Sequence, residues 1–144
     1  MNDIKTKIQQ RYPQAKFPAP FAKMLGIHFT KLKDGSAEAK ITVDKAWTNP
    51  FGIAHGGFLF TILDETLGSA ACSILDKEIY NDVKALSTTN HDIFFHAPAI
   101  PGDQLIIKSR VVSNRKNMIF VEGTIQKKDN TLIAESKGIW FIKR

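Results

Sequence analysis

The sequence predicts an α+β protein in which six antiparallel strands wrap around one long central helix. The helix is predicted from residues 49–75, where about twenty consecutive residues after an entry turn lack proline and carry almost no charge. Strands are predicted on both sides of it, because apolar residues alternate with period two before residue 44 and again after residue 82. Turn-forming residues separate these alternating segments. The predicted order is therefore two strands, one largely buried helix and four further strands.

The first 25 residues predict a short helical arm in front of this unit. Asn2 or Asp3 can cap a helix whose apolar residues recur at helical spacing until Pro13 ends it. A second apolar turn follows and stops at Gly26. We expect an arm that packs against the rest of the chain, with a lid as the alternative.

The alternating segments are the evidence for the six strands. Before the helix, alternation runs from Ile27 to Val43 and is interrupted by Asp34-Gly35, a typical hairpin turn sequence. After the helix, the breaks are expected at Pro98 to Gly102, at Ser113-Asn114 and at Asp129-Asn130, which gives strands over 83–96, 104–113, 117–127 and 131–143.

Length and cysteine content indicate one domain in a reducing compartment. A chain of 144 residues can bury roughly 70% of its unfolded surface, so its core needs neither a disulfide nor a metal. The single cysteine, Cys72, cannot form an internal disulfide and reads as a small buried residue. The N-terminus has no apolar signal core, and the longest uncharged run contains proline and glycines. We expect a single domain over residues 1–144 in the cytoplasm, with no membrane association.

The positive net charge permits binding of anions. The net charge is +6 and the sequence pI is about 9.5. The basic residues are scattered, however, and neither a basic helix nor an aromatic platform is present. A nucleic-acid partner is therefore disfavoured, whereas an anionic small molecule with a nucleotide moiety would use the same surplus charge.

Two adjacent acids, Asp64 and Glu65, mark the candidate site in the long helix. Burying a carboxylate in an apolar helix is costly unless it is paired, hydrogen-bonded or functional. Neighbouring side chains on a helix point about 100° apart, so we expect only one of the two to line a given pocket. At the start of the same helix, His55-Gly56-Gly57 offers free amides and a partial positive charge that a substrate oxygen can approach.

The spacing of these residues resembles that of the hotdog-fold, PaaI-like acyl-CoA thioesterases of the 4-hydroxybenzoyl-CoA thioesterase superfamily. Asn49 lies six residues before His55, and Asp64 lies nine residues after it. A second matching piece is the segment 92–98, with Gly102-Asp103 after it. The resemblance covers the chain from about Gly26 to the C-terminus and implies an enzyme that hydrolyses acyl-CoA to a free acid and CoA.

The resemblance also implies a role for each residue of the motif. Asp64 would be the general base or nucleophile that acts on the thioester, and the backbone N–H of Gly56 would polarise its carbonyl. Asn49 and His55 would orient the reacting groups, and Thr88 on the following strand would support the water. Such sites form between two subunits, so the resemblance implies a dimer or a tetramer of dimers.

The distance between the two halves of the site argues for the same shared arrangement. Asp64 lies eight residues beyond Gly56 on one helix, which is about 12 Å at a rise of 1.5 Å per residue. Both cannot meet one carbonyl within a single helix, so a second copy must supply the other half.

Substrate contacts are expected from Gly57, Phe60 and Gly68. The glycines allow close approach of a ligand, and Phe60 suits an apolar or aromatic acyl group, although each could equally serve the core. No cofactor is expected, because CoA is part of the substrate. The spacing of His28, His91 and His96 matches no zinc signature, and we expect no metal.

Several alternatives stay open at this stage. His55 could serve only as a helix cap, Thr88 could be an ordinary strand residue, and Glu65 could replace Asp64 as the catalytic acid. The whole protein could instead be a non-catalytic acyl-CoA sensor or a hotdog dehydratase. Release of free thiol from acyl-CoA would exclude the sensor.

Overall fold

The computed structural model describes residue 6 and residues 16–75 and 82–144. The helix expected between Asn2 and Pro13 lies outside the described residues. The elements in chain order are α2 (Pro20–Leu25), β1 (His28–Lys33), β2 (Ser36–Thr42), the short 3-10 helix η1 (Lys45–Trp47), α3 (Gly56–Ser73), β3 (Ala85–Phe95), β4 (Gln104–Arg115), β5 (Met118–Lys127) and β6 (Leu132–Lys143).

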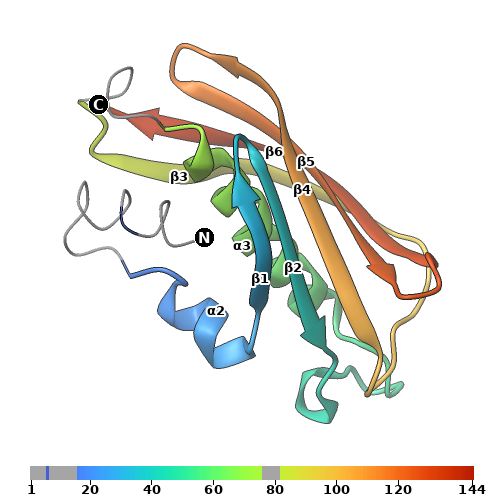
Figure 1. Ribbon diagram of the computed structural model, residues 1–144. Helices are drawn as coiled ribbons and strands as arrows, with labels where there is room; N and C mark the ends of the chain where they lie inside the picture. The colour runs from blue at the N-terminus through green and yellow to red at the C-terminus, as the bar shows by residue number, and fades with distance from the viewer. Residues whose placement is uncertain (1–5, 7–15, 76–81) are drawn as a thin grey trace.

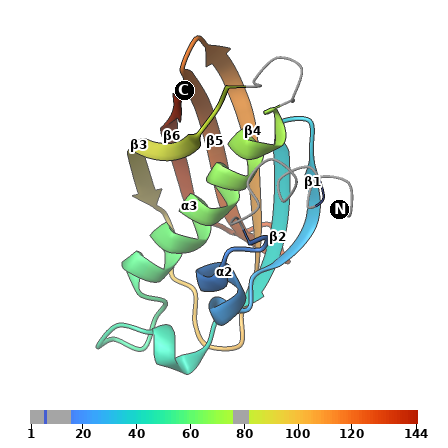
Figure 2. The same ribbon diagram turned by 90° about the vertical axis from the view of Figure 1, so that its left-hand side faces the viewer.

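The six strands form one antiparallel sheet in the order β1-β2-β4-β5-β6-β3. The sheet curves around α3, which lies in its hollow, while α2 lies between α3 and the β1 edge (Figures 1 and 2). The predicted α+β class, with six antiparallel strands around one long helix, is confirmed. Strands β1 and β3 form the two edges of the sheet, so one long side of β3 carries no neighbouring strand among the described residues.

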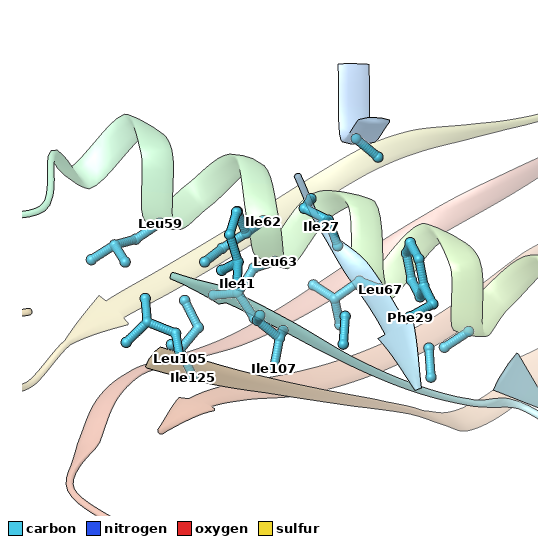
Figure 3. Packing of buried hydrophobic residues seen from close by; sticks show 14 of the residues in the cluster. Ile27, Phe29, Ile41, Leu59, Ile62, Leu63, Leu67, Leu105, Ile107 and Ile125 are labelled. Carbon is cyan, nitrogen blue, oxygen red and sulfur yellow. The ribbon is translucent and has the colours of Figure 1, made fainter. Parts of the chain in front are cut away.

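The core lies between one face of α3 and the sheet. Buried residues come in pairs along the helix, each followed by a half-buried or exposed pair. Figure 3 shows aliphatic side chains of α3 directed at residues of β2, β4 and β5. The buried members of α3 are Phe58, Leu59, Ile62, Leu63, Thr66, Leu67, Ala70 and Ala71.

The other face of α3 is open in the single chain. It carries the intervening pairs, Phe60-Thr61, Asp64-Glu65, Gly68-Ser69 and Cys72-Ser73, all of which are half-buried. The prediction of burial on most sides of the helix is therefore wrong for one chain alone. We call this surface, with these eight residues, the open face of α3.

The structure has the breaks predicted at Gly26, Asp34-Gly35, Pro98 to Gly102 and Asp129-Asn130, but not the one predicted at Ser113-Asn114. Gly26 ends α2 in the left-handed region with φ of 77°, and Asp34-Gly35 turns between β1 and β2 with φ of 51° and 77°. Strand β4 runs to Arg115, two residues past the predicted break, and turns at Lys116, whose φ is 53°. A register shift between Val111 and Ser113 accompanies this extension.

The described helices include none with the length and apolar content that a membrane span requires.

Candidate active site

His55 is the N-cap of α3. Its Nδ1 accepts a hydrogen bond of 2.8 Å from the backbone N–H of Gly57, and its backbone carbonyl accepts one from Leu59. A neutral imidazole that accepts at Nδ1 carries its proton on Nε2. The capping role that the sequence left open for His55 is therefore present, and Nε2–H remains as a donor.

Gly56 is the first residue of α3, where a backbone N–H has no partner within the helix. Among the described residues, no acceptor lies within hydrogen-bonding distance of this N–H. The ring of Phe95, at the end of β3, lies 3.4 Å from the point where a Cβ on Gly56 would stand. The amide is thus unpaired at the positive end of the helix dipole, and a side chain at this position would contact the Phe95 ring.

Asn49 shapes the loop that leads into the helix. Its Oδ1 accepts a hydrogen bond of 2.9 Å from Phe51 N–H, and its backbone N–H donates to the carbonyl of Ile53. A stacked pair, Trp47 and Phe58, with ring centroids 5.0 Å apart, fixes this loop on the first turn of α3. Within one chain, Asn49 therefore acts on its own loop, and its Nδ2 remains as a donor.

Asp64 and Thr88 are hydrogen-bonded to each other in the structure. The hydroxyl of Thr88 on β3 donates a hydrogen bond of 3.1 Å to Oδ1 of Asp64 on α3. The Asp64 side chain is 38% exposed, so it is anchored at one oxygen while solvent can still reach it. This pairing gives a carboxylate and a hydroxyl on adjacent elements, which is a suitable arrangement for holding a water molecule.

His91 is a residue of this site that the sequence analysis missed. Its Nδ1 lies 3.5 Å from Asp64 Oδ1, its side chain is only 1% exposed, and its Nε2 is hydrogen-bonded to the hydroxyl of Ser136 on β6. The ring of Phe60 covers it, with centroids 4.1 Å apart. Phe60, expected to contact substrate, thus contacts His91 in the single chain.

A β-bulge in β3 determines which of its side chains face α3. Thr88 pairs with Trp140 and Asn90 pairs with Ile139, so Thr89 has no partner of its own. Strict alternation from Thr88 would place Asn90 on the helix-facing side. The extra residue shifts the pattern by one and turns His91 toward α3 instead.

Glu65 lies beside Asp64 on the open face of α3. Burial raises the pKa of the Glu65 carboxyl, and the negative charge of Asp64 raises it further. Both acids border a recess of about 260 Å³ that also includes Gly68. The prediction that only one of them could line a given pocket is therefore wrong, because both half-buried side chains border the same recess. Contacts from Thr88 and His91 nevertheless single out Asp64.

The recess runs from Asp64 along α3 toward its C-terminal end. Gly68 faces Trp140, whose Nε1 lies 3.2 Å from the point where a Cβ on Gly68 would stand. Gly57, the other glycine expected to contact substrate, instead donates its N–H to His55. The remaining lining residues are Lys16, Phe17, Ser69, Cys72 and Leu86.

The described residues contain no group of three or more His, Cys, Asp and Glu side chains that could hold a metal ion. The groups that this site offers among the described residues are a carboxylate, a hydroxyl and an unpaired amide. Gly56 and Asp64 are eight residues apart on one helix, about 12 Å, so one chain cannot place both at one atom.

Comparison with known proteins places the chain among thioesterases. Residues 51–134 match the family model of the thioesterase superfamily, a span that includes Gly56, Asp64, Thr88 and His91 but not Asn49. The chain is 32% identical over 120 residues to a candidate esterase of Saccharolobus solfataricus, which covers 83% of this chain and 75% of that relative.

Solved structures share the fold at low sequence identity. The E. coli PaaI protein from the phenylacetic acid degradation operon has a TM-score of 0.81 and 22% identity, covering 99% of this chain and 95% of that one. A Streptococcus mutans protein bound to acetyl-CoA has a TM-score of 0.71 and 21% identity, covering 81% of this chain and 88% of that one.

Proposed function

The chain belongs to the thioesterase superfamily and is a thioester hydrolase of hotdog fold, and from this premise we propose that it cleaves acyl-CoA to a free acid and coenzyme A. The observation that carries the proposal is the Asp64–Thr88 pair beside a recess on the open face of α3. A carboxylate with one oxygen anchored and one free is suited to activate water next to a bound thioester.

In the proposed reaction, Asp64 acts as a general base. It takes a proton from water as the water oxygen bonds to the thioester carbonyl carbon, and the carbonyl oxygen becomes an oxyanion. The Gly56 N–H, at the positive end of α3, stabilises that oxyanion. The oxyanion then collapses and the C–S bond breaks. Protonated Asp64 gives its proton to the departing sulfur, so CoA leaves as the thiol, the free acid is released and the Asp64 carboxylate is restored.

We propose that each site combines two chains. The argument is the separation of about 12 Å between Gly56 and Asp64 within one helix, which a second copy in the opposite orientation can close. Two surfaces support such pairing: the unpaired edge of β3, which bears the 61%-exposed Phe94, and the open face of α3. Pairing of two β3 edges would extend the sheet and bring the two open faces together.

The substrate parts are assigned by their chemistry. The acyl group would enter the recess, whose walls include Phe17 and Trp140, while Gly68 leaves room for it. The phosphates of CoA would be attracted by the net charge of +6. The Streptococcus mutans structure with bound acetyl-CoA supports a CoA ester as the ligand class.

Mixing of two inactive variants tests the shared site directly. Asp64→Asn removes the base, and Gly56→Val places a side chain against Phe95 and at the oxyanion position. Each variant alone should release little thiol from an acyl-CoA panel of acetyl, medium-chain, benzoyl and phenylacetyl esters. Unfolding and refolding them together should restore about a quarter of wild-type activity, because half of the dimers are mixed and each has one intact site.

The matched control is Glu65→Gln, the neighbouring acid in the same recess. We expect it to retain turnover, and a dead Glu65→Gln with an active Asp64→Asn would reverse the assignment. Failure of the mixture to recover activity would overturn the shared site. Binding of acyl-CoA without thiol release by the wild type would favour a sensor instead of an enzyme.

A further inference from the structure

We propose that His91 is a positioning residue, whose Nδ1–H donates to the Asp64 carboxylate and so holds it in place. This inference rests on the proposed role of Asp64 as the base. The geometry points to a relay of three side chains on three elements. Ser136 of β6 contacts Nε2 of His91 on β3, and Nδ1 of His91 faces Oδ1 of Asp64 on α3.

The tautomer follows from what each ring nitrogen faces. Nδ1 is buried and has no hydrogen-bond partner within the described part of the chain, and Asp64 Oδ1 lies 3.5 Å away. A lone pair on Nδ1 would face a carboxylate oxygen, which repels it. A proton on Nδ1 is attracted to the same oxygen. Nε2 is then the acceptor, and the Ser136 hydroxyl donates to it.

Thr88 and His91 face the same oxygen of Asp64. Thr88 donates to Oδ1 at 3.1 Å, and Nδ1 of His91 faces Oδ1 at 3.5 Å. Among the described residues, neither contact involves Oδ2. These contacts hold the carboxylate at Oδ1 and leave Oδ2 for a water molecule or a substrate in the recess that Asp64 lines.

The His91 ring is held by its neighbours, whereas the partly exposed Asp64 side chain can move. Phe60 covers the imidazole at 4.1 Å, and Trp140 lies on another side at 6.1 Å, so the ring has little freedom. Asp64 is 38% exposed, and a movement of about 0.5 Å would bring its Oδ1 to an ordinary hydrogen-bond length. Closure of this contact on substrate binding would align the base for proton transfer.

The tautomer can be read without any activity measurement. In protein labelled with ¹⁵N-histidine, two-bond ¹H–¹⁵N spectra separate protonated from unprotonated ring nitrogens. The His91 signals are assigned by their loss in His91→Asn. We expect Nδ1 protonated and Nε2 unprotonated at pH 8, and a proton on Nε2 would overturn the proposal even if thioester hydrolysis is confirmed.

Kinetics test the consequence for catalysis. His91→Leu keeps the bulk but removes the donor, and kcat should fall about 10- to 100-fold, as expected for loss of a hydrogen bond to a charged group. KM should change by less than about threefold, since substrate contacts are retained. His91→Asn places an amide where Nδ1 stood, and its kcat should be at least about threefold higher than that of His91→Leu.

Two further variants separate positioning from packing. Ser136→Ala leaves the packing intact but releases Nε2, so kcat should fall and the tautomer populations should change. His28→Asn, on the opposite edge strand β1, is the matched histidine control and should leave kcat unchanged. Wild-type kcat in both His91→Leu and Ser136→Ala would show that His91 is only a packed residue.

Discussion

His55 can be tested for two separate roles, because its two ring nitrogens have different partners. Nδ1 caps α3 by accepting from Gly57 N–H at 2.8 Å, and Nε2 is left as a donor beside the proposed oxyanion site. His55→Ala removes both functions. His55→Asn restores a side-chain acceptor at the N-cap, where asparagine is among the preferred residues, but it has no counterpart of Nε2.

The expected magnitudes follow from that geometry. Loss of an N-cap acceptor costs about 1 kcal/mol, which corresponds to a fall in Tm of about 3–5 °C for a chain of this length. His55→Asn should unfold within about 2 °C of the wild type. Its kcat should nevertheless fall at least about tenfold, because the Nε2–H donor is gone.

Thermal unfolding and thiol release, both measured at one fixed protein concentration, give the two readouts. Asp44→Ala is the control, since Asp44 caps η1 through Ala46 N–H at 2.7 Å and should affect Tm but not kcat. Wild-type kcat in His55→Asn would refute a catalytic role for Nε2. An unchanged Tm in His55→Ala would refute the stabilising cap.

Two further predictions concern the recess. Because burial and Asp64 raise the pKa of Glu65, the folded state holds the Glu65 proton more tightly than the unfolded state, and its contribution to stability is lost as pH rises through the folded value. Glu65→Gln should therefore raise Tm relative to wild type at pH 8 but not at pH 4, and an equal difference at both pH values would contradict this. Gly68→Ala places a methyl group 3.2 Å from Trp140 Nε1, so kcat/KM should fall more for benzoyl-CoA than for acetyl-CoA in thiol-release assays. An equal fall for both esters would mean that the acyl group lies elsewhere.

Local sequence signals predicted the frame of the fold well. The Asp34-Gly35 turn and the stop at Gly26 depend on backbone conformations that few residues adopt, so these residue types carry strong local information. The family pattern placed Thr88 beside the reacting water, and in the structure its hydroxyl contacts Asp64.

What the sequence could not show depends on contacts between distant segments. The bulge at Thr89 moves the side chain of every later residue of β3 to the other face of the sheet, and no residue type in that strand marks the bulge. His91 therefore could not be placed beside Asp64 from the sequence. The open face of α3 was missed for a related reason, since half-buried small and polar residues do not reveal whether a sheet or a second chain covers them.

The incomplete covering of α3 has a consequence for how this protein must be handled. If every turnover needs the aspartate of one polypeptide and the glycine amide of another, then specific activity is a function of enzyme concentration. Serial dilution would dissociate the dimer and abolish activity, although no covalent bond changes. At low protein concentration, initial rates should then be lower than proportionality to enzyme concentration predicts. Saturating substrate contacts both chains of a dimer and should restore that proportionality.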